Sequence, residues 1–138
     1  MVARWVHIPK VGGSNPSCAP KLIINMNTID FNTLVHKLNE HANEVMSKKG
    51  PEYTQESDDV LNNFKSTSKR IGISELKVWS IFFDKQVQSI MSHVNNPNLD
   101  KAESLESRFA DVINYCRLGH ALFIERESGK IKEIYNDN

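Results

Sequence analysis

Hydrophobic positions repeat at helical spacing from residue 30 onward. In residues 31–46 they recur every three or four positions, which aligns them on one face of an α-helix. This face comprises Phe31, Leu34, Val35, Leu38, Ala42, Val45 and Met46. Asp30 can cap the start of the helix, and Gly50 followed by Pro51 is a typical stop. The pattern therefore predicts a first helix that ends at Gly50.

A second and a third helix are predicted between residues 60 and 94. The second has apolar side chains at Val60, Leu61, Phe64 and Ile71. Gly72 can end it, and Ser74 can cap the helix that follows. The apolar positions of the third helix follow a seven-residue repeat at Leu76, Trp79, Phe83, Val87, Ile90 and Val94, with Val78 and Phe82 beside them. We expect this to be the central helix of the protein.

A fourth, long helix is predicted after the chain break at residues 95–98. Asp100 and Glu103 have the spacing of a capping box. The apolar stripe comprises Ala102, Leu105, Phe109, Val112, Cys116, Gly119 and Phe123, so that Cys116 is predicted to be a small core residue. From Ser128 onward no element is assigned. Together the four patterns predict an all-α protein that folds as a compact bundle of about four helices.

The first 25 residues differ from the rest of the chain. They show no helical or strand periodicity. They contain the structure-breaking residues Gly12, Gly13, Pro16 and Pro20. We expect residues 1–25 to be a disordered arm and residues 26–138 to form a single helical domain, because a chain of this length supports one hydrophobic core.

The nucleic acid that encodes this arm suggests how it arose. Residues 13–16 can be back-translated as GGT TCG AAT CCN, the T-arm of a transfer RNA. Residues 5–9 permit an anticodon arm with the anticodon CAT, in the correct order ahead of the T-arm. We expect that the reading frame runs through a methionine-type transfer RNA gene and that translation starts at Met26; a genuine flexible arm is the alternative. Genes packed against transfer RNA genes are common in bacteriophages, which favours a viral origin.

Charge and hydropathy exclude several classes of protein. The chain has 17 basic and 17 acidic residues, and residues 1–25 hold three of the basic ones and no acid, which leaves the predicted domain at −3. Sequence-independent nucleic-acid binding needs a basic face and is not expected. No apolar run is long enough to span a membrane, and we expect a cytoplasmic protein. Cys18 and Cys116 lack the spacing of a metal site or a disulfide framework.

Two stretches of the chain carry motifs. The first is Lys49-Gly50-Pro51-Glu52-Tyr53, followed by Leu61-Asn62-Asn63-Phe64. The second is Asp84-Lys85, followed by residues 103–115 with Glu-Ser, then Asp, then Asn-Tyr. Over about residues 30–125 the chain resembles the nucleotide modification associated domain 1 family, small helical proteins common in phages. Ser107 stands where that family tends to have an acid. The resemblance implies a helical domain associated with nucleotide metabolism.

The arrangement is also distantly similar to the MazG-like all-α nucleoside triphosphate pyrophosphohydrolases. Those enzymes hold magnesium with carboxylates from two helices and cleave between the α- and β-phosphates, since hard divalent cations need oxygen ligands. The resemblance implies a nucleotide-binding or nucleotide-hydrolysing domain in phage nucleotide metabolism or DNA modification, with Mg²⁺ as cofactor. The implied metal ligands are Glu103, Glu106 and Asp111; the implied catalytic residues are Lys85 and Glu106; the implied substrate contacts are Tyr53, Asn63, Lys85 and Asn114.

The same residues also have an ordinary structural interpretation. Glu103 can serve a helix cap, Glu106 can pair with Lys85 or Arg117, and Asn114 can satisfy a buried polar contact. The functional alternative is a non-catalytic helical interaction protein of a phage, which binds a host protein or associates with itself. Convergence of the three carboxylates with Lys85 would favour the enzyme. In either case we expect a homo-oligomer, with Leu76 and the aromatic side chains of the third helix as interface candidates.

Overall fold

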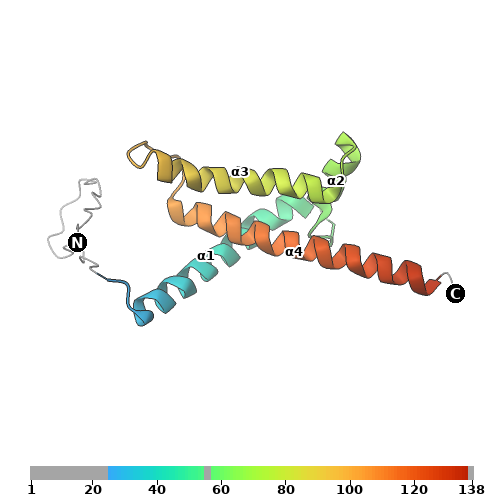
Figure 1. Ribbon diagram of the computed structural model, residues 1–138, viewed down its shortest axis with the longest axis horizontal. Helices are drawn as coiled ribbons and strands as arrows, with labels where there is room; N and C mark the ends of the chain where they lie inside the picture. Colours follow the sequence, from blue (N-terminus) through green and yellow to red (C-terminus); the bar gives the residue numbers. More distant parts are fainter. Residues whose placement is uncertain (1–24, 55–56, 137–138) are drawn as a thin grey trace.

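The computed structural model describes residues 25–54 and 57–136, with side chains as far as residue 129. The arm with its transfer-RNA-like segment lies outside the described residues, apart from Asn25. Within these ranges the chain forms four α-helices and no strand (Figure 1): α1 (Thr28–Thr54), α2 (Asn62–Ile71), α3 (Glu75–Asn95) and α4 (Leu105–Asn136). The predicted all-α bundle is confirmed. None of these helices combines the length and the apolar character that crossing a membrane requires.

The helices are arranged around α4, which has the most extensive contacts. α3 and α4 run side by side, and α1 crosses α4 with its C-terminal half (Figure 1). α2 is short and packs where the start of α3 and the end of α1 meet. The N-terminal half of α1 and the C-terminal half of α4 project beyond the other helices. The central helix is therefore α4, and the prediction that the third helix is central is wrong.

The first helix begins earlier and ends later than predicted. The side-chain oxygen of Asn27 accepts a hydrogen bond from the Asp30 backbone N–H at 2.9 Å, and its amide donates to the Asp30 carboxylate at 2.8 Å. Asn27 is thus the cap, and Asp30 is its partner in the first turn. The predicted stop at Gly50 is wrong, because α1 continues through Pro51 to Thr54. This extra turn carries Tyr53.

The ends of the other helices confirm some predictions and correct one. Gly72 closes α2 in the left-handed conformation, with φ 74°, and the Ser74 hydroxyl accepts from the Lys77 backbone N–H. The capping box predicted at residues 100–103 is wrong: α4 begins at Leu105, and the Ser104 hydroxyl accepts from the Ser107 backbone N–H at 3.1 Å. Ser104 is a better cap because its side chain reaches that N–H directly. The helix then continues to Asn136.

The hydrophobic core lies where α2, α3 and α4 meet. Its buried side chains are Leu61, Phe64, Val78 and Leu122, surrounded by the half-buried Ile73, Leu76, Trp79, Phe82, Tyr115, Leu118 and Ala121. The Trp79 indole N–H donates to the Tyr115 carbonyl at 2.7 Å. Gly119 makes this close approach possible, since a Cβ atom there would lie 2.4 Å from the Trp79 ring. The α3–α4 contact is thus built around a glycine.

The buried face of α4 differs from the predicted stripe. Ala110, Asp111, Asn114 and Leu122 are buried, whereas Leu105 and Phe109 are each 42% exposed, Phe123 is 47% exposed and Cys116 is exposed. At 100° per residue the two faces are centred about 170° apart, nearly half a turn. The prediction that Leu105, Phe109, Cys116 and Phe123 belong to the core is therefore wrong, whereas Gly119 of the same stripe is buried. Polar side chains of α4 take the inner positions because α1 offers them hydrogen-bonding partners.

Candidate functional site

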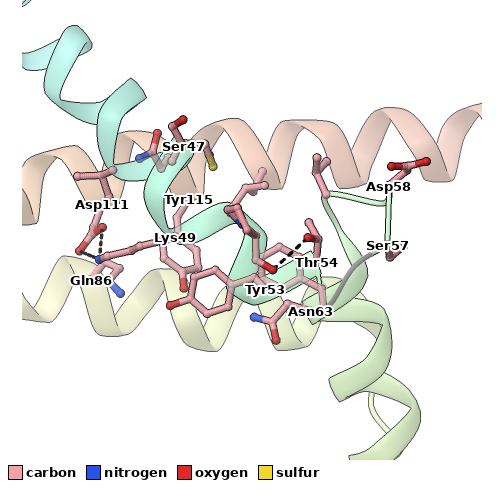
Figure 2. Close-up of a pocket in the computed structure, with 18 residues that line it drawn as sticks. Ser47, Lys49, Tyr53, Thr54, Ser57, Asp58, Asn63, Gln86, Asp111 and Tyr115 are labelled. Carbon is pink, nitrogen blue, oxygen red and sulfur yellow. Dashed lines mark hydrogen bonds and ion pairs between the residues drawn. The ribbon is translucent and has the colours of Figure 1, made fainter.

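A pocket of about 440 Å³ lies between the C-terminal half of α1, the start of α2, and the facing sides of α3 and α4 (Figure 2). We call it the α1 pocket. Its apolar lining includes Val45, Met46, Pro51, Val60, Phe64 and Leu118. Its polar lining includes Lys49, Tyr53, Asn63, Gln86, Asp111, Asn114 and Tyr115. A largely apolar cavity with a few convergent polar groups is the usual form of a small-molecule site.

One ion pair lies at the wall of the pocket. The ammonium of Lys49 is 3.2 Å and 3.4 Å from the two carboxylate oxygens of Asp111. The Lys49 side chain is 46% exposed and that of Asp111 12% exposed, so that the pair is partly open to water. Such a pair contributes little to stability. Lys49 is the one basic side chain among the described residues that line the pocket, and a bound anion would have to draw it from Asp111 or share it.

Asn114 forms part of the wall but is held by structural contacts. Its amide N–H donates to the Ala42 carbonyl at 2.8 Å, across the α1–α4 contact. Its side-chain oxygen accepts from Arg117 at 3.1 Å, and the same Arg117 nitrogen donates to the Asn43 side chain at 2.9 Å. The residue is only 5% exposed. The interpretation of Asn114 as a satisfied buried polar residue is the one that this geometry favours.

Two tyrosines bring aromatic surface and hydroxyl groups to the pocket. Burial raises the pKa of Tyr115, and the neighbouring Tyr53 and Asp111 raise it further, while Gln86 acts in the opposite direction. The Tyr115 hydroxyl therefore keeps its proton at neutral pH and can donate a hydrogen bond. Tyr53 is 45% exposed at the mouth of the pocket and lies near Asn63 (Figure 2).

The structure brings together four of the seven residues predicted for the site. Tyr53, Asn63, Asp111 and Asn114 line the α1 pocket. Lys85, Glu103 and Glu106 are exposed and do not line it. Glu106 and Asp111 are five positions apart, which places them about 140° apart around α4. Lys85 is one position from Gln86 and so points about 100° away from it. The predicted set therefore does not converge.

The acidic residues also do not assemble a magnesium site. In the described ranges no three side chains of His, Cys, Asp or Glu are close enough to hold one ion. Asp111 is the one predicted ligand at the pocket, and it already accepts from Lys49. The predicted ligand set of Glu103, Glu106 and Asp111 does not fit this arrangement.

Sequence reasoning did not single out Lys49, Gln86 and Tyr115 as site residues. Lys49 and Tyr115 lie within the two motif stretches, Lys49 four positions before Tyr53 and Tyr115 directly after Asn114, so that the motifs themselves were a usable signal. Gln86 is a single uncharged residue between Lys85 and Val87, and only the packing of α3 on α4 shows which way it faces.

Comparison with known proteins gave no further assignment. Searches against protein-family models, curated proteins and solved structures each found no match. The resemblance to the nucleotide modification associated domain 1 family therefore stays a prediction.

Proposed function

We propose that this protein binds a nucleotide in the α1 pocket. The observation that carries the proposal is the combination, around one cavity, of an aromatic ring at the mouth, side-chain amides and a single lysine. A cavity of about 440 Å³ lies within the usual range of small-ligand sites, about 300–1,000 Å³. The resemblance of the two motif stretches to a nucleotide-associated family supports the same class of ligand, because both stretches contribute residues to the lining.

The lining suggests how the ligand would be oriented. Tyr53 offers a partly exposed ring on which a base can stack, and the Asn63 amide beside it can recognise the base edge. Lys49 lies on the Asp111 side of the pocket and would meet a phosphate. With one lysine facing two acids in the lining, Asp58 and Asp111, the pocket suits a nucleoside or a nucleotide with few phosphates better than a triphosphate.

Binding is better supported than hydrolysis. The carboxylates that a MazG-like reaction would use, Glu103 and Glu106, lie outside the pocket. A pyrophosphohydrolase acting in phage nucleotide metabolism would need magnesium brought by the phosphates themselves, with Asp111 as its protein ligand. Magnesium-dependent pyrophosphate release is therefore measured as a separate step from binding.

The test is calorimetric titration of the full chain with nucleosides and nucleotides, with and without magnesium. Tyr53→Ala should weaken binding about 5- to 150-fold, the range for a lost base–aromatic stack of about 1–3 kcal/mol. Lys49→Met should weaken the binding of nucleotides and leave nucleosides unchanged. Asn63→Ala should also weaken binding, because it removes the amide beside Tyr53. Its matched control is Asn39→Ala, since Asn39 is exposed on α1 outside the pocket. No binding of any nucleoside or nucleotide would refute the proposal.

The second candidate function is a helical interaction protein without chemistry of its own. A specific observation favours a protein partner independently of the pocket: Leu105, Phe109 and Phe123 of α4 are large apolar side chains and are exposed. Since the two features lie on different sides of α4, binding of a nucleotide and binding of a protein partner do not exclude one another.

A further inference from the structure

The ion pair in the wall of the α1 pocket has one fixed partner and one movable partner (Figure 2). Asp111 lies on the buried side of α4, and its side chain is 12% exposed. Lys49 reaches it from α1 with a flexible four-carbon side chain that is 46% exposed. A ligand can therefore displace the ammonium much more easily than the carboxylate. The negative charge of Asp111 stays at the pocket whatever binds there.

An anion in the pocket would meet this carboxylate in one of two ways. If the anion drew Lys49 to itself, Asp111 would be left nearly buried without a counter-charge, which is strongly unfavourable. If it shared Lys49, its oxygens would lie close to those of Asp111, because the ammonium is 3.2 Å and 3.4 Å from the two carboxylate oxygens. Phosphate and carboxylate oxygens only accept hydrogen bonds, so that neither can satisfy the other. Both arrangements lower the affinity for a charged ligand.

The other charges of the lining act in the same direction. Among the described residues that line the pocket the charged ones are Lys49, Asp58 and Asp111, one positive and two negative. The lining is therefore negative before any ligand binds. A hydroxyl group is uncharged and can donate a hydrogen bond, so that it can bind to Asp111 while Lys49 stays in place. The lining thus suits a hydroxyl better than a phosphate beside Asp111.

We infer that Asp111 makes the α1 pocket select a nucleoside over the corresponding nucleotides. The inference rests on the proposed function and narrows its ligand class to the uncharged members. In the proposed orientation the 5′ end of the ligand faces Lys49 and Asp111, and this end carries a hydroxyl in a nucleoside and a phosphate in a nucleotide. Such a site gains specificity by placing an unpaired charge against the wrong ligand. Asp111 is then a specificity-determining residue of the pocket.

Calorimetric titration of the full chain without magnesium tests this selection. Each common nucleoside is compared with its 5′-monophosphate and with its 5′-O-sulfamoyl derivative, which has the bulk of a phosphate without its charge. The wild type should bind the monophosphate at least about tenfold more weakly than the nucleoside, the scale expected for like charges at a partly buried site. The sulfamoyl derivative should bind about as tightly as the nucleoside. This comparison uses only the wild type, so that it is decisive even if a substitution unfolds the protein.

Asp111→Asn removes the charge and keeps the shape of the side chain. It should raise the affinity for the monophosphate at least about tenfold, because the repulsion is gone. The affinity for the nucleoside should change little, since an amide oxygen still accepts from a hydroxyl. Asp84→Asn is the matched control, because it changes the net charge by the same amount and Asp84 is exposed on α3 outside the pocket lining. Circular dichroism checks that both variants keep their helices.

Several results would overturn the inference and still leave the α1 pocket as a binding site. A monophosphate that binds the wild type as tightly as its nucleoside would show that no selection exists. A sulfamoyl derivative that binds as weakly as the monophosphate would show that size and not charge is selected. An unchanged affinity ratio in the Asp111→Asn variant would remove Asp111 from the explanation. Failure of every nucleoside and nucleotide to bind would instead refute the proposed function, and this inference with it.

Discussion

The two contacts that α4 makes inside the protein are built from different chemistry. Its contact with α1 is made by hydrogen bonds and an ion pair: Asn114 to the Ala42 carbonyl, Arg117 to Asn43, and Lys49 to Asp111. Its contact with α2 and α3 is made by aromatic and aliphatic packing around Phe64. Hydrogen bonds fix the relative position of two helices, whereas burial of apolar surface supplies most of the stability.

The α1 pocket lies where these two kinds of contact meet. Phe64 and Tyr115 reach it from the apolar side, and Lys49, Asp111 and Asn114 reach it from the polar side. A ligand there would find an apolar floor beside polar groups that are already held in place. The comparison predicts that damage to the apolar contact will cost stability, while damage to the polar contact will change the position of α1.

The largest expected effect is on the apolar contact. Phe64 is 2% exposed and meets Tyr115 edge-on with ring centres 6.4 Å apart. Phe64→Ala should lower the free energy of unfolding by about 3–5 kcal/mol, through lost burial and the cavity that remains. Urea denaturation followed by circular dichroism measures it. Phe31→Ala, at an exposed phenylalanine on α1, should change the stability by less than about 1 kcal/mol, and equal losses in the two variants would contradict the proposed core.

A smaller effect is expected from the polar contact. Asn114→Ala removes a buried hydrogen bond to the Ala42 carbonyl, which still accepts from the backbone of α1, and should cost about 0.5–1.5 kcal/mol. Asn43→Ala removes only an exposed contact with Arg117 and should cost less than about 0.5 kcal/mol. Hydrogen exchange of the α1 amides would show whether α1 loosens in the Asn114 variant. If both variants behave alike, Asn114 does not anchor α1.

The smallest effect is a dependence of stability on pH at the start of α2. The Lys65 ammonium lies 2.6 Å from both Asp59 and Glu125. Its hydrogen bond lowers the pKa of Asp59, partly opposed by burial of the carboxyl. Burial acts to lower the pKa of Lys65, but the hydrogen bonds that Lys65 donates to the two carboxylates, together with their negative charges, outweigh it and the pKa is raised.

The sign of this dependence follows from the lowered pKa of Asp59. Its contribution is complete above the unfolded pKa, near 3.8, and is lost as the pH falls through the lower folded value. The side chains are partly exposed, so that the contribution should stay below about 1 kcal/mol. Lys65→Met should reduce the loss of stability between pH 6 and pH 2 in urea denaturation. An unchanged slope would show that Asp59 is not coupled to Lys65.

The sequence predicted where the four helices lie, but it did not predict which face of α4 is buried. Periodicity located all four helices, and Gly72 and Ser74 marked their boundaries correctly, because these signals are local. The buried side of α4 could not be predicted in this way, since α4 contacts α1 with polar residues and leaves its most apolar stripe outside. Motif positions indicated Tyr53, Asn63 and Asp111 at the pocket. The lysine at the pocket is Lys49 and not Lys85, because α1 packs across α4 and brings Lys49 next to Asp111, which the periodicity of a single helix cannot predict.

Trp79 gives the protein an optical reporter at the contact between α3 and α4. Its indole is held by the Tyr115 carbonyl, rests against Gly119 and stacks on Phe83. Fluorescence emission of an indole moves to shorter wavelength when water is removed from its surroundings. In a Trp5→Phe variant the emission of Trp79 can therefore follow the α3–α4 contact directly, without a label.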